Sequence, residues 1–339
     1  MTTLLVPSRA EVTIGYAPML QQFHPDDAIR HCVEAAEVGF GGVVLSDHFQ
    51  PWLPQQGNAS FMWSVMGALG QRVSVPLLGV TTPGYRSHPA VTAQAAATIA
   101  ALYPGRFQLG LGAGQSVNEH IVAEYWPPAS ERVERLFEAV DLVRKLLGSS
   151  RRDVRHDGDH FRFEAARLWT LPDEPPPVVV ATSGPVAARR AGRVADGIIT
   201  VQSTPDRLQL MLERFEAGVT ESQSSGPRRR MIQLHVSWAP TREQALRNAR
   251  DEWAHGGLRF PTADIRSPYD IALMTRHVSD DDLTDRMLIS AEPDEHRAHI
   301  QRYVDLGFDH VYVHNVGRNQ SEFIQMYATH ILPQIGSRS

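Results

Sequence analysis

An acid and two aromatic side chains follow an early apolar run. Residues 42–45 read Gly-Val-Val-Leu and predict a short buried strand, after which come Asp47, His48 and, past a proline, Trp52. In α/β folds the carboxyl ends of strands are where ligands bind and chemistry happens. The alternative is that Asp47 caps the next helix and His48 is an ordinary loop histidine.

Small residues with free amides follow two later strands. Residues 110–114 read Gly-Leu-Gly-Ala-Gly, with Asn118 just beyond, although glycines also build ordinary turns. Residues 180–185 lead a strand into a helix that starts at Pro185, and amides beside a positive helix terminus suit a phosphate. A cap by Thr182 or Ser183 would explain the same residues without a ligand. We favour the phosphate, because TIM barrels often bind one in their late strand loops.

A glycine interrupts a third apolar strand at Gly79-Val80. A residue without a side chain lets a planar group lie against the backbone, and a β-bulge is the alternative.

Strands and helices alternate along the chain. Nearly continuous apolar strands that alternate with helices indicate a parallel sheet covered on both faces. Eight such strands predict an α/β fold of the (β/α)8 TIM-barrel class, whereas a Rossmann fold would want a glycine fingerprint after its first strand. Residues 156–160 predict a hairpin insertion, and residues 256–282 are long enough for a lid or extra helices near the mouth. The expected strands are residues 12–16, 42–45, 76–83, 107–111, 175–181, 197–201, 231–238 and 310–314.

Composition limits the classes of protein. The 339 residues fit one barrel domain over 1–339, with 42% hydrophobic and 21% charged residues as in ordinary globular proteins. The net charge of -5 argues against nucleic acid as a partner. No apolar run approaches the roughly 18 residues of a membrane span, residues 1–7 lack a signal-peptide pattern, and the single Cys32 fits a reducing compartment. We therefore expect no membrane partner and a cytoplasmic location.

Two other kinds of chemistry have no visible carrier. His156 and His160 lie four apart, but in a charged, turn-like segment that favours a solvated loop over a zinc site, so no metal is expected. There is no Gly-x-Ser-x-Gly elbow, and Cys32 is expected within a helix, so a nucleophilic hydrolase is not indicated.

Taken together, these motifs resemble the luciferase-like superfamily of flavin and deazaflavin barrels. Within it the chain is similar to the F420-dependent oxidoreductases typified by F420-dependent glucose-6-phosphate dehydrogenase, and the likeness runs over nearly the whole chain. The most specific motif is Ser-Asp-His-Phe-x-Pro-Trp. The resemblance is carried by residues 46–52, 104–114, 118–120, 183–185, 195–197 and 311–314.

The resemblance implies coenzyme F420, with FMN as the alternative, bound across the carboxyl ends of the strands. Asp47 and His48 would line the deazaflavin near its reactive carbon, with His48 as the acid or base, because histidine has a pKa near neutrality. Trp52 would wall the substrate side. Gly79-Val80 would form a cis peptide that bulges against the ring, at a cost of about 3 kcal/mol. The remaining expected contacts are Asn118 and the glycine run Gly112, Ala113 and Gly114 at the cofactor, and Ala181, Thr182, Ser183 and Gly184 at its phosphate.

The chain departs from the glucose-6-phosphate enzymes at several positions. Gln21 and Gln115 stand where those enzymes carry two active-site glutamates, and glutamine cannot exchange a proton at neutral pH. Those enzymes hold the sugar phosphate with two lysines and an arginine. In this chain one lysine position falls at Thr204 and the other in the lysine-free insertion, so only the arginine, Arg286, remains. We therefore expect His48, Trp52, Gln21 and Gln115 as the catalytic set, with Trp52 and Arg286 at the substrate.

The sequence thus predicts an F420-dependent oxidoreductase that passes a hydride between the deazaflavin and a small organic substrate other than glucose 6-phosphate. An FMN-dependent luciferase-like monooxygenase and a non-catalytic deazaflavin-binding protein are the alternatives. By resemblance, a homodimer is expected.

Overall fold

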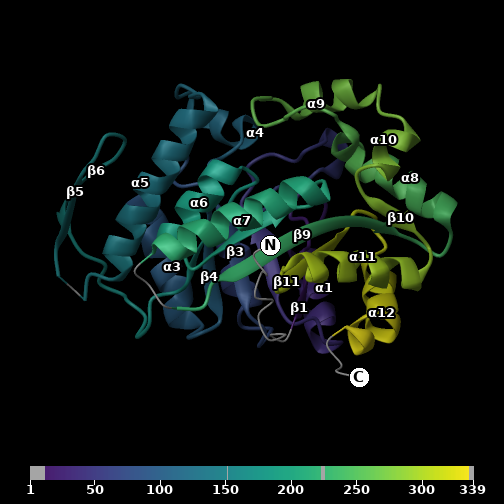
Figure 1. Ribbon diagram of the computed structural model, residues 1–339, viewed down its shortest axis with the longest axis horizontal. Coiled ribbons are helices and arrows are strands. Elements are labelled where there is room, and N and C mark those ends of the chain that lie inside the picture. Colours follow the sequence, from purple (N-terminus) through teal and green to yellow (C-terminus); the bar gives the residue numbers. More distant parts are fainter. Residues whose placement is uncertain (1–11, 151, 223–225, 336–339) are drawn as a thin grey trace, which may run out of the picture.

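A computed structural model describes residues 12–150, 152–222 and 226–335 of the chain (Figure 1). Residues 1–7, on which the expectation of no signal peptide rests, lie outside the described residues. No helix in the described ranges is long and apolar enough to cross a membrane.

Eight parallel strands close into a barrel. Pairing runs in the order β11-β1-β2-β3-β4-β7-β8-β9, and β9 pairs back onto β11. This closure confirms the TIM barrel over the open Rossmann sheet. The barrel strands are β1 (Thr13–Tyr16), β2 (Val43–Ser46), β3 (Leu77–Thr81), β4 (Phe107–Gly112), β7 (Val178–Ala181), β8 (Gly197–Val201), β9 (Arg229–Trp238) and β11 (His310–Asn315).

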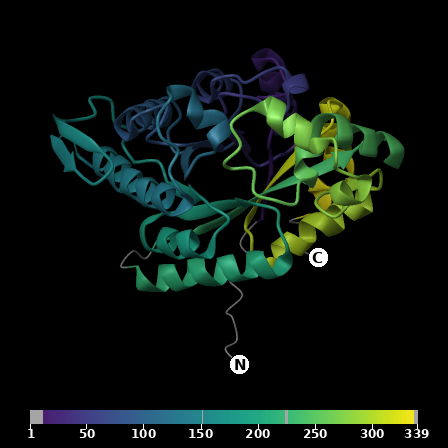
Figure 2. The ribbon, with the colours of Figure 1, turned by 90° about the horizontal axis from the view of Figure 1, so that it is seen from above.

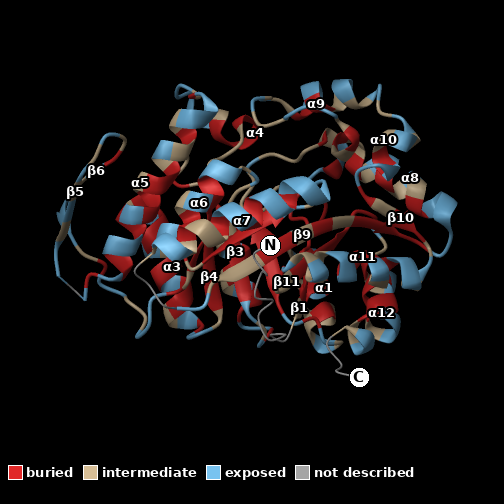
Figure 3. Ribbon diagram, viewed as in Figure 1, coloured by how far each residue is buried: buried red, intermediate tan, exposed pale blue. Residues whose placement is uncertain are grey.

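Helices cover the outside of the barrel. Figure 3 shows buried strands at the centre and helices whose outer faces are exposed. Prolines begin many of these helices, because proline tolerates the first turn, where its missing N–H costs no hydrogen bond. The longer helices are α1 (Pro25–Glu37), α2 (Met62–Leu69), α3 (Pro89–Leu102), α5 (Ala129–Leu147), α6 (Pro185–Val194), α7 (Pro205–Glu221), α8 (Arg242–Trp253), α11 (Pro293–Leu306) and α12 (Gln320–His330).

Side chains alternate between the two faces of each strand, which defines the barrel interior. In β9, Met231 packs in the interior cluster, whereas Ile232 and Leu234 pack in the outer core against the helices. In β11, Tyr312 lies inside and Val313 outside. Because the side-chain period of a strand is two, the inward series continues toward the carboxyl ends with Gln233 and His235 in β9 and with His314 in β11.

Two insertions decorate the barrel. The hairpin predicted around residues 156–160 is present as β5 (Val154–Asp157) paired with β6 (Arg162–Ala166), and it stands off the body beside α5 (Figure 2). The insertion at residues 256–282 contains part of the 3-10 helix η3 (Ala254–Gly257), then α9 (Pro268–Thr275) and the start of α10 (Asp280–Thr284).

Some elements were not foreseen. β10 (Leu288–Ser290) pairs in parallel with Val236 to Trp238 of β9, and three residues are too few to show a period. The short helices α4 (Ser116–Glu119), η1 (Pro54–Gln56), η2 (His120–Val122) and η4 (Leu332–Gln334) were also missed. Of these, α4 matters for function because it carries Asn118.

Candidate active site

A largely buried arginine joins two carboxylates at the carboxyl ends of the early strands. Arg86 Nη2 lies 3.2 Å from Asp47 Oδ2, and Arg86 Nε lies 3.1 Å from Glu119 Oε2. Thr81 Oγ1 also donates to Asp47 Oδ2 at 2.7 Å. Burial raises the pKa of Glu119, and Arg86 acts against that rise. Asp47 is therefore fixed inside an ion-pair network. It does not cap the helices that follow, because Leu53 and Phe61 hold those positions.

Asn118 determines how His48 presents its ring. The Asn118 Oδ1 atom accepts hydrogen bonds from the backbone N–H groups of Phe49 at 3.0 Å and Gln50 at 3.2 Å. Its Nδ2 atom must then face His48 Nδ1, 3.2 Å away, as a donor. This assigns the lone pair of neutral His48 to Nδ1 and the proton to Nε2.

Burial lowers the pKa of His48 to about 4, with Arg86 lowering it further and Asp47 opposing the change. His48 is therefore neutral at pH 7, whereas the sequence led us to expect a group that titrates near neutrality. A neutral imidazole with a fixed Nε2–H can donate a hydrogen bond to a substrate oxygen.

Trp52 belongs to a group of stacked rings. Its centroid lies 5.2 Å from that of His48, and it stacks on His255 at 4.9 Å with an interplanar angle of 16°. Trp253 continues the group at 4.2 Å from His255 and 4.6 Å from His235. The rings form a flat, uncharged wall, because burial lowers the pKa of His235 to about 4 and that of His255 well below its usual value.

The two expected glutamines lie in different surroundings. Gln21 is fully buried, and within the described chain neither polar atom of its side chain has a hydrogen-bond partner. Both ring nitrogens of His255 are unpartnered in the same way. Buried polar atoms without partners are costly, so these side chains fit a bound polar group. Gln115 is half-buried at the N-cap of α4.

The start of α6 keeps amides available. Gly184 is its N-cap, and no side chain caps the helix, so the alternative of a cap by Thr182 or Ser183 is wrong. Thr182 Oγ1 instead accepts from the Gly184 N–H at 3.2 Å, and Ser183 is exposed. A Cβ on Gly184 would meet nothing within 4 Å. A phosphate would find open space and a positive helix terminus here.

The expected cis peptide at Gly79-Val80 is wrong. All described peptide bonds are trans, and β3 pairs in register with both neighbours through these residues. A Cβ on Gly79 would lie 3.2 Å from Met62 Cε and 3.3 Å from Met66 Cε, both on α2. The glycine therefore accommodates outward helix packing, and Val80 points inward to pack against the interior cluster.

The glycines at residues 112 and 114 differ in whether the backbone and its neighbours require glycine there. Gly114 has φ +86°, and a Cβ there would lie 2.9 Å from Thr82 Cγ2, so only glycine fits. A Cβ on Gly112 would make ordinary contact with Ala181 at 3.5 Å. Ala113 packs against the outer core. Gly112 on β4 and Ala181 on β7 therefore place no bulky side chain in the barrel interior.

The insertion of residues 256–282 packs beside this site and is held there by apolar contacts and hydrogen bonds. Ile271 of α9 packs with Leu53 and Val117, and Trp52 lies against the same cluster. Asp264 accepts hydrogen bonds from Trp126 Nε1 at 2.8 Å and Arg132 Nη1 at 2.7 Å. Arg286, by contrast, is exposed, and its carbonyl accepts from Gln202 beyond β8.

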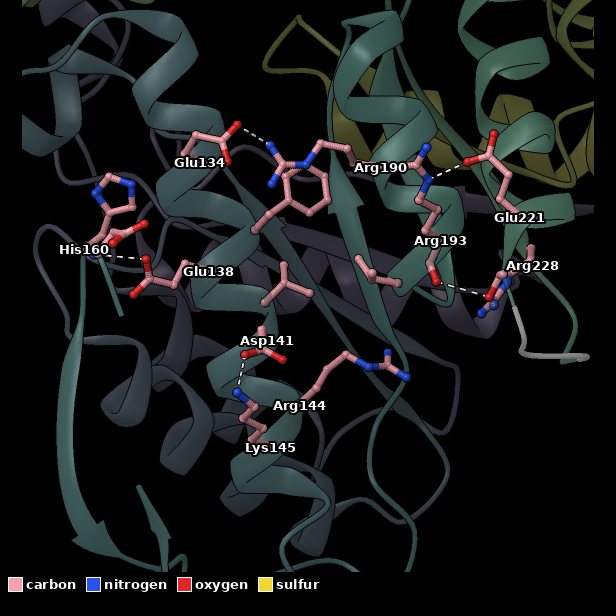
Figure 4. A pocket seen from close by; sticks show the side chains of 15 residues that line it. Glu134, Glu138, Asp141, Arg144, Lys145, His160, Arg190, Arg193, Glu221 and Arg228 are labelled. Carbon is pink, nitrogen blue, oxygen red and sulfur yellow. Dashed lines mark hydrogen bonds and ion pairs between the residues drawn. The ribbon is translucent and has the colours of Figure 1, made fainter. Parts of the chain in front are cut away.

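A groove of about 1160 Å³ lies elsewhere, on the outside of the barrel between α5, α6 and the end of α7 (Figure 4). Its charges pair with one another, as Arg190 does with Glu134 and Lys145 with Asp141. We assign no chemistry to it.

A family model for luciferase-like monooxygenases matches residues 2–310. The chain belongs to this family. It is 35% identical to an F420-dependent glucose-6-phosphate dehydrogenase of Microbacterium testaceum, covering 96% of this chain and 97% of that one. It is also 35% identical to the enzyme of that name from Mycobacterium tuberculosis, with 96% and 98% covered.

A solved structure of an F420-dependent secondary alcohol dehydrogenase, in complex with an F420-acetone adduct, superimposes with a TM-score of 0.89. It is 29% identical and covers 95% of this chain and 98% of that one. The F420-dependent oxidoreductase branch and the F420 cofactor inferred from the motifs are thereby confirmed at the level of the family.

Sequence reasoning found Asp47, His48, Trp52 and Asn118, which the structure brings together. It missed Arg86, Glu119, Trp253, His235 and His255. Glu119 and His120 stood beside Asn118 in the motif, whereas Trp253 and His255 lie just before the insertion of residues 256–282. Nothing in the sequence related Arg86 to Asp47.

Proposed function

We propose that this protein is an F420-dependent oxidoreductase that interconverts an uncharged alcohol and its carbonyl compound. The observation that carries the proposal is the neutral ring wall beside His48, formed by Trp52, His255 and Trp253. Such a wall suits an uncharged organic molecule and offers no positive charge to a phosphate dianion.

The chain contains one lysine, Lys145, and it lies in α5 paired with Asp141 at 2.6 Å (Figure 4). A clamp of two lysines cannot be assembled here. Arg286 alone remains, and it is exposed. The named relatives act on glucose 6-phosphate or on a secondary alcohol, and these features favour the second class of substrate.

The residues present fit the cofactor. Gln21 and His255 offer buried polar atoms without partners, and the uncapped start of α6 offers amides to a phosphate. Asp47, Asn118, Gly112 to Gly114 and Ala181 to Gly184 would hold F420. When bound, F420 supplies or accepts a hydride at the reactive carbon of its ring.

The protein's own residues would orient the substrate oxygen. His48 Nε2–H would donate to that oxygen and stabilise the negative charge that grows on it, and would then pass its proton to the oxygen to complete the alcohol, after which the ring regains a proton from water. Trp52 excludes water from one side. Gln21 and Gln115 bind without exchanging protons, because an amide has no ionisation near neutral pH.

Steady-state kinetics with F420 test the proposal. We expect turnover of simple secondary alcohols or ketones and little turnover of glucose 6-phosphate. A larger kcat/KM for glucose 6-phosphate than for any neutral alcohol would contradict it. Tight F420 binding without turnover of any alcohol or carbonyl would favour a carrier, and an FMN spectrum in the purified holoprotein would favour the monooxygenase.

The homodimer and the cytoplasmic location stay predictions, as does the absence of a nucleic-acid partner. Sedimentation of the purified protein at micromolar concentration tests the first of these.

A further inference from the structure

Two histidines face each other inside the barrel and have no part in the function proposed above. Strands β9 and β11 lie side by side (Figure 1), and His235 of β9 is paired in register with His314 of β11. Both point inward, because they continue the series of Met231 and Tyr312. Their Nδ1 atoms lie 3.0 Å apart, so one of them must donate and the other accept.

Gln22 decides which histidine donates. Its Nε2 atom donates to the Val316 carbonyl at 2.8 Å and to Glu252 Oε2 at 3.2 Å. Its Oε1 atom therefore faces His314 Nε2, at 3.2 Å, and an amide oxygen can only accept. His314 Nε2 carries the proton.

The rest of the chain of hydrogen bonds follows. Burial keeps the pKa of His314 well below its usual value, so this ring carries a single proton and its Nδ1 is a lone pair. His235 Nδ1 must donate to it. That leaves the lone pair of neutral His235 at Nε2.

His235 Nε2 is the open end of this chain. Among the described residues it has no hydrogen-bond partner, and His235 as a residue is half-buried. The ring is held in place by the bond to His314 and by Trp253, whose plane is tilted 31° to it at 4.6 Å. Its backbone N–H is fixed as well, by Gln202 Oε1 at 3.0 Å.

His48 and His235 are thus fixed in opposite senses. Asn118 makes His48 a donor at Nε2, and the Gln22-His314 pair makes His235 an acceptor at Nε2. Ring contacts of Trp52, His255 and Trp253 link the two, so they are separate positions along one wall.

We propose that His235 Nε2 accepts a hydrogen bond from a substrate hydroxyl other than the oxygen that reacts at His48. The substrate class is then an uncharged hydroxy-carbonyl compound and the corresponding diol. This rests on the proposed function for the place of the reacting oxygen. Gln22 and His314 are positioning residues that act through His235.

The protonation pattern can be read directly in the cofactor-free protein. NMR of the imidazole nitrogens in isotope-labelled protein should show His235 protonated at Nδ1 and unprotonated at Nε2, with His48 in the reverse pattern. His235→Phe assigns the resonance by removing it. A His235 ring protonated at Nε2 would overturn the inference, whatever the enzyme turns over.

Probe titration tests the hydroxyl. Propylene glycol should shift the His235 Nε2 resonance, and its monomethyl ether blocked at the donating oxygen should not. In kinetics, the wild-type protein should prefer hydroxyacetone to methoxyacetone by about tenfold in KM, the span expected for one hydrogen bond.

In His235→Phe that preference should fall to about one. His314→Leu should also lose it, whereas His314→Gln, which keeps an oxygen to accept from His235 Nδ1, should retain part of it. Equal treatment of both ketones by the wild-type protein would refute the assignment of His235 while leaving F420-dependent carbonyl reduction intact. If the wild-type protein turns over neither ketone while its NMR pattern is as expected, the proposed function is refuted instead.

Discussion

At the scale of single residues, one amide sets what His48 can do. Asn118 uses its oxygen on the backbone of Phe49 and Gln50, so only its NH₂ group can reach the imidazole. An aspartate of the same shape would present only oxygens to that ring. It would require a proton at His48 Nδ1 and would raise the pKa of the imidazole by its charge.

His48→Ala should lower kcat by about a hundredfold, the loss usual for a positioned proton donor, with little change in F420 affinity.

The dependence of the wild-type rate on pH should show no ionisation of His48 between pH 5 and pH 8, because its pKa is about 4. In Asn118→Asp an ionisation should enter that range. A wild-type profile with a histidine-like step near pH 6.5 would show that His48 is not held neutral.

At the scale of elements, the sequence could predict the barrel because its strands are nearly continuously apolar and alternate with helices. It could also place Asp47 and His48, because they directly follow such a strand. The His235-His314 pair was beyond reach, since it depends on the register of strands 79 residues apart. Arg86 was missed because its contact with Asp47 joins two loops 39 residues apart. The cis peptide expected at Gly79-Val80 was wrong because a glycine in a strand looks alike whether a helix or a cofactor lies against it.

The start of α6 gives a prediction at this scale. Val186 is 72% exposed in its first turn, so Val186→Glu adds a negative charge without disturbing the core. Glutamate stabilises a helix start but repels a phosphate there, and we expect the Kd for F420 to rise about tenfold. The matched control Val186→Gln has the same shape without the charge.

Fluorescence titration with F420 measures both variants, and a deazaflavin without the phosphate should bind each equally. If Val186→Glu and Val186→Gln bind F420 alike, the phosphate lies elsewhere.

At the scale of the whole molecule, buried histidines couple stability to pH. Burial lowers the pKa of seven of them from 6.5, to about 4 for His48, His235 and His296 and to about 3 for His299. The others are His31, His255 and His314. Each ring stays neutral in the folded protein at a pH where it is charged in the unfolded chain.

The unfolded chain therefore binds more protons than the folded protein between about pH 6.5 and pH 4, so the free energy of unfolding must fall as the pH is lowered through that window. Each proton contributes a slope of about 1.4 kcal/mol per pH unit, and three or more together would remove much of a stability of roughly 5–15 kcal/mol.

Urea unfolding from pH 7.5 to pH 4.5 measures this free energy of unfolding. It should stay unchanged above pH 6.5 and fall steeply below it. His296→Gln, at a ring that contacts Tyr327 and Ser290 and none of the proposed cofactor contacts, removes one titrating group and should reduce the slope by about one proton. A free energy of unfolding that does not change from pH 7 to pH 5 would mean that these rings are charged in the folded protein. The wall beside Trp52 would then not be neutral.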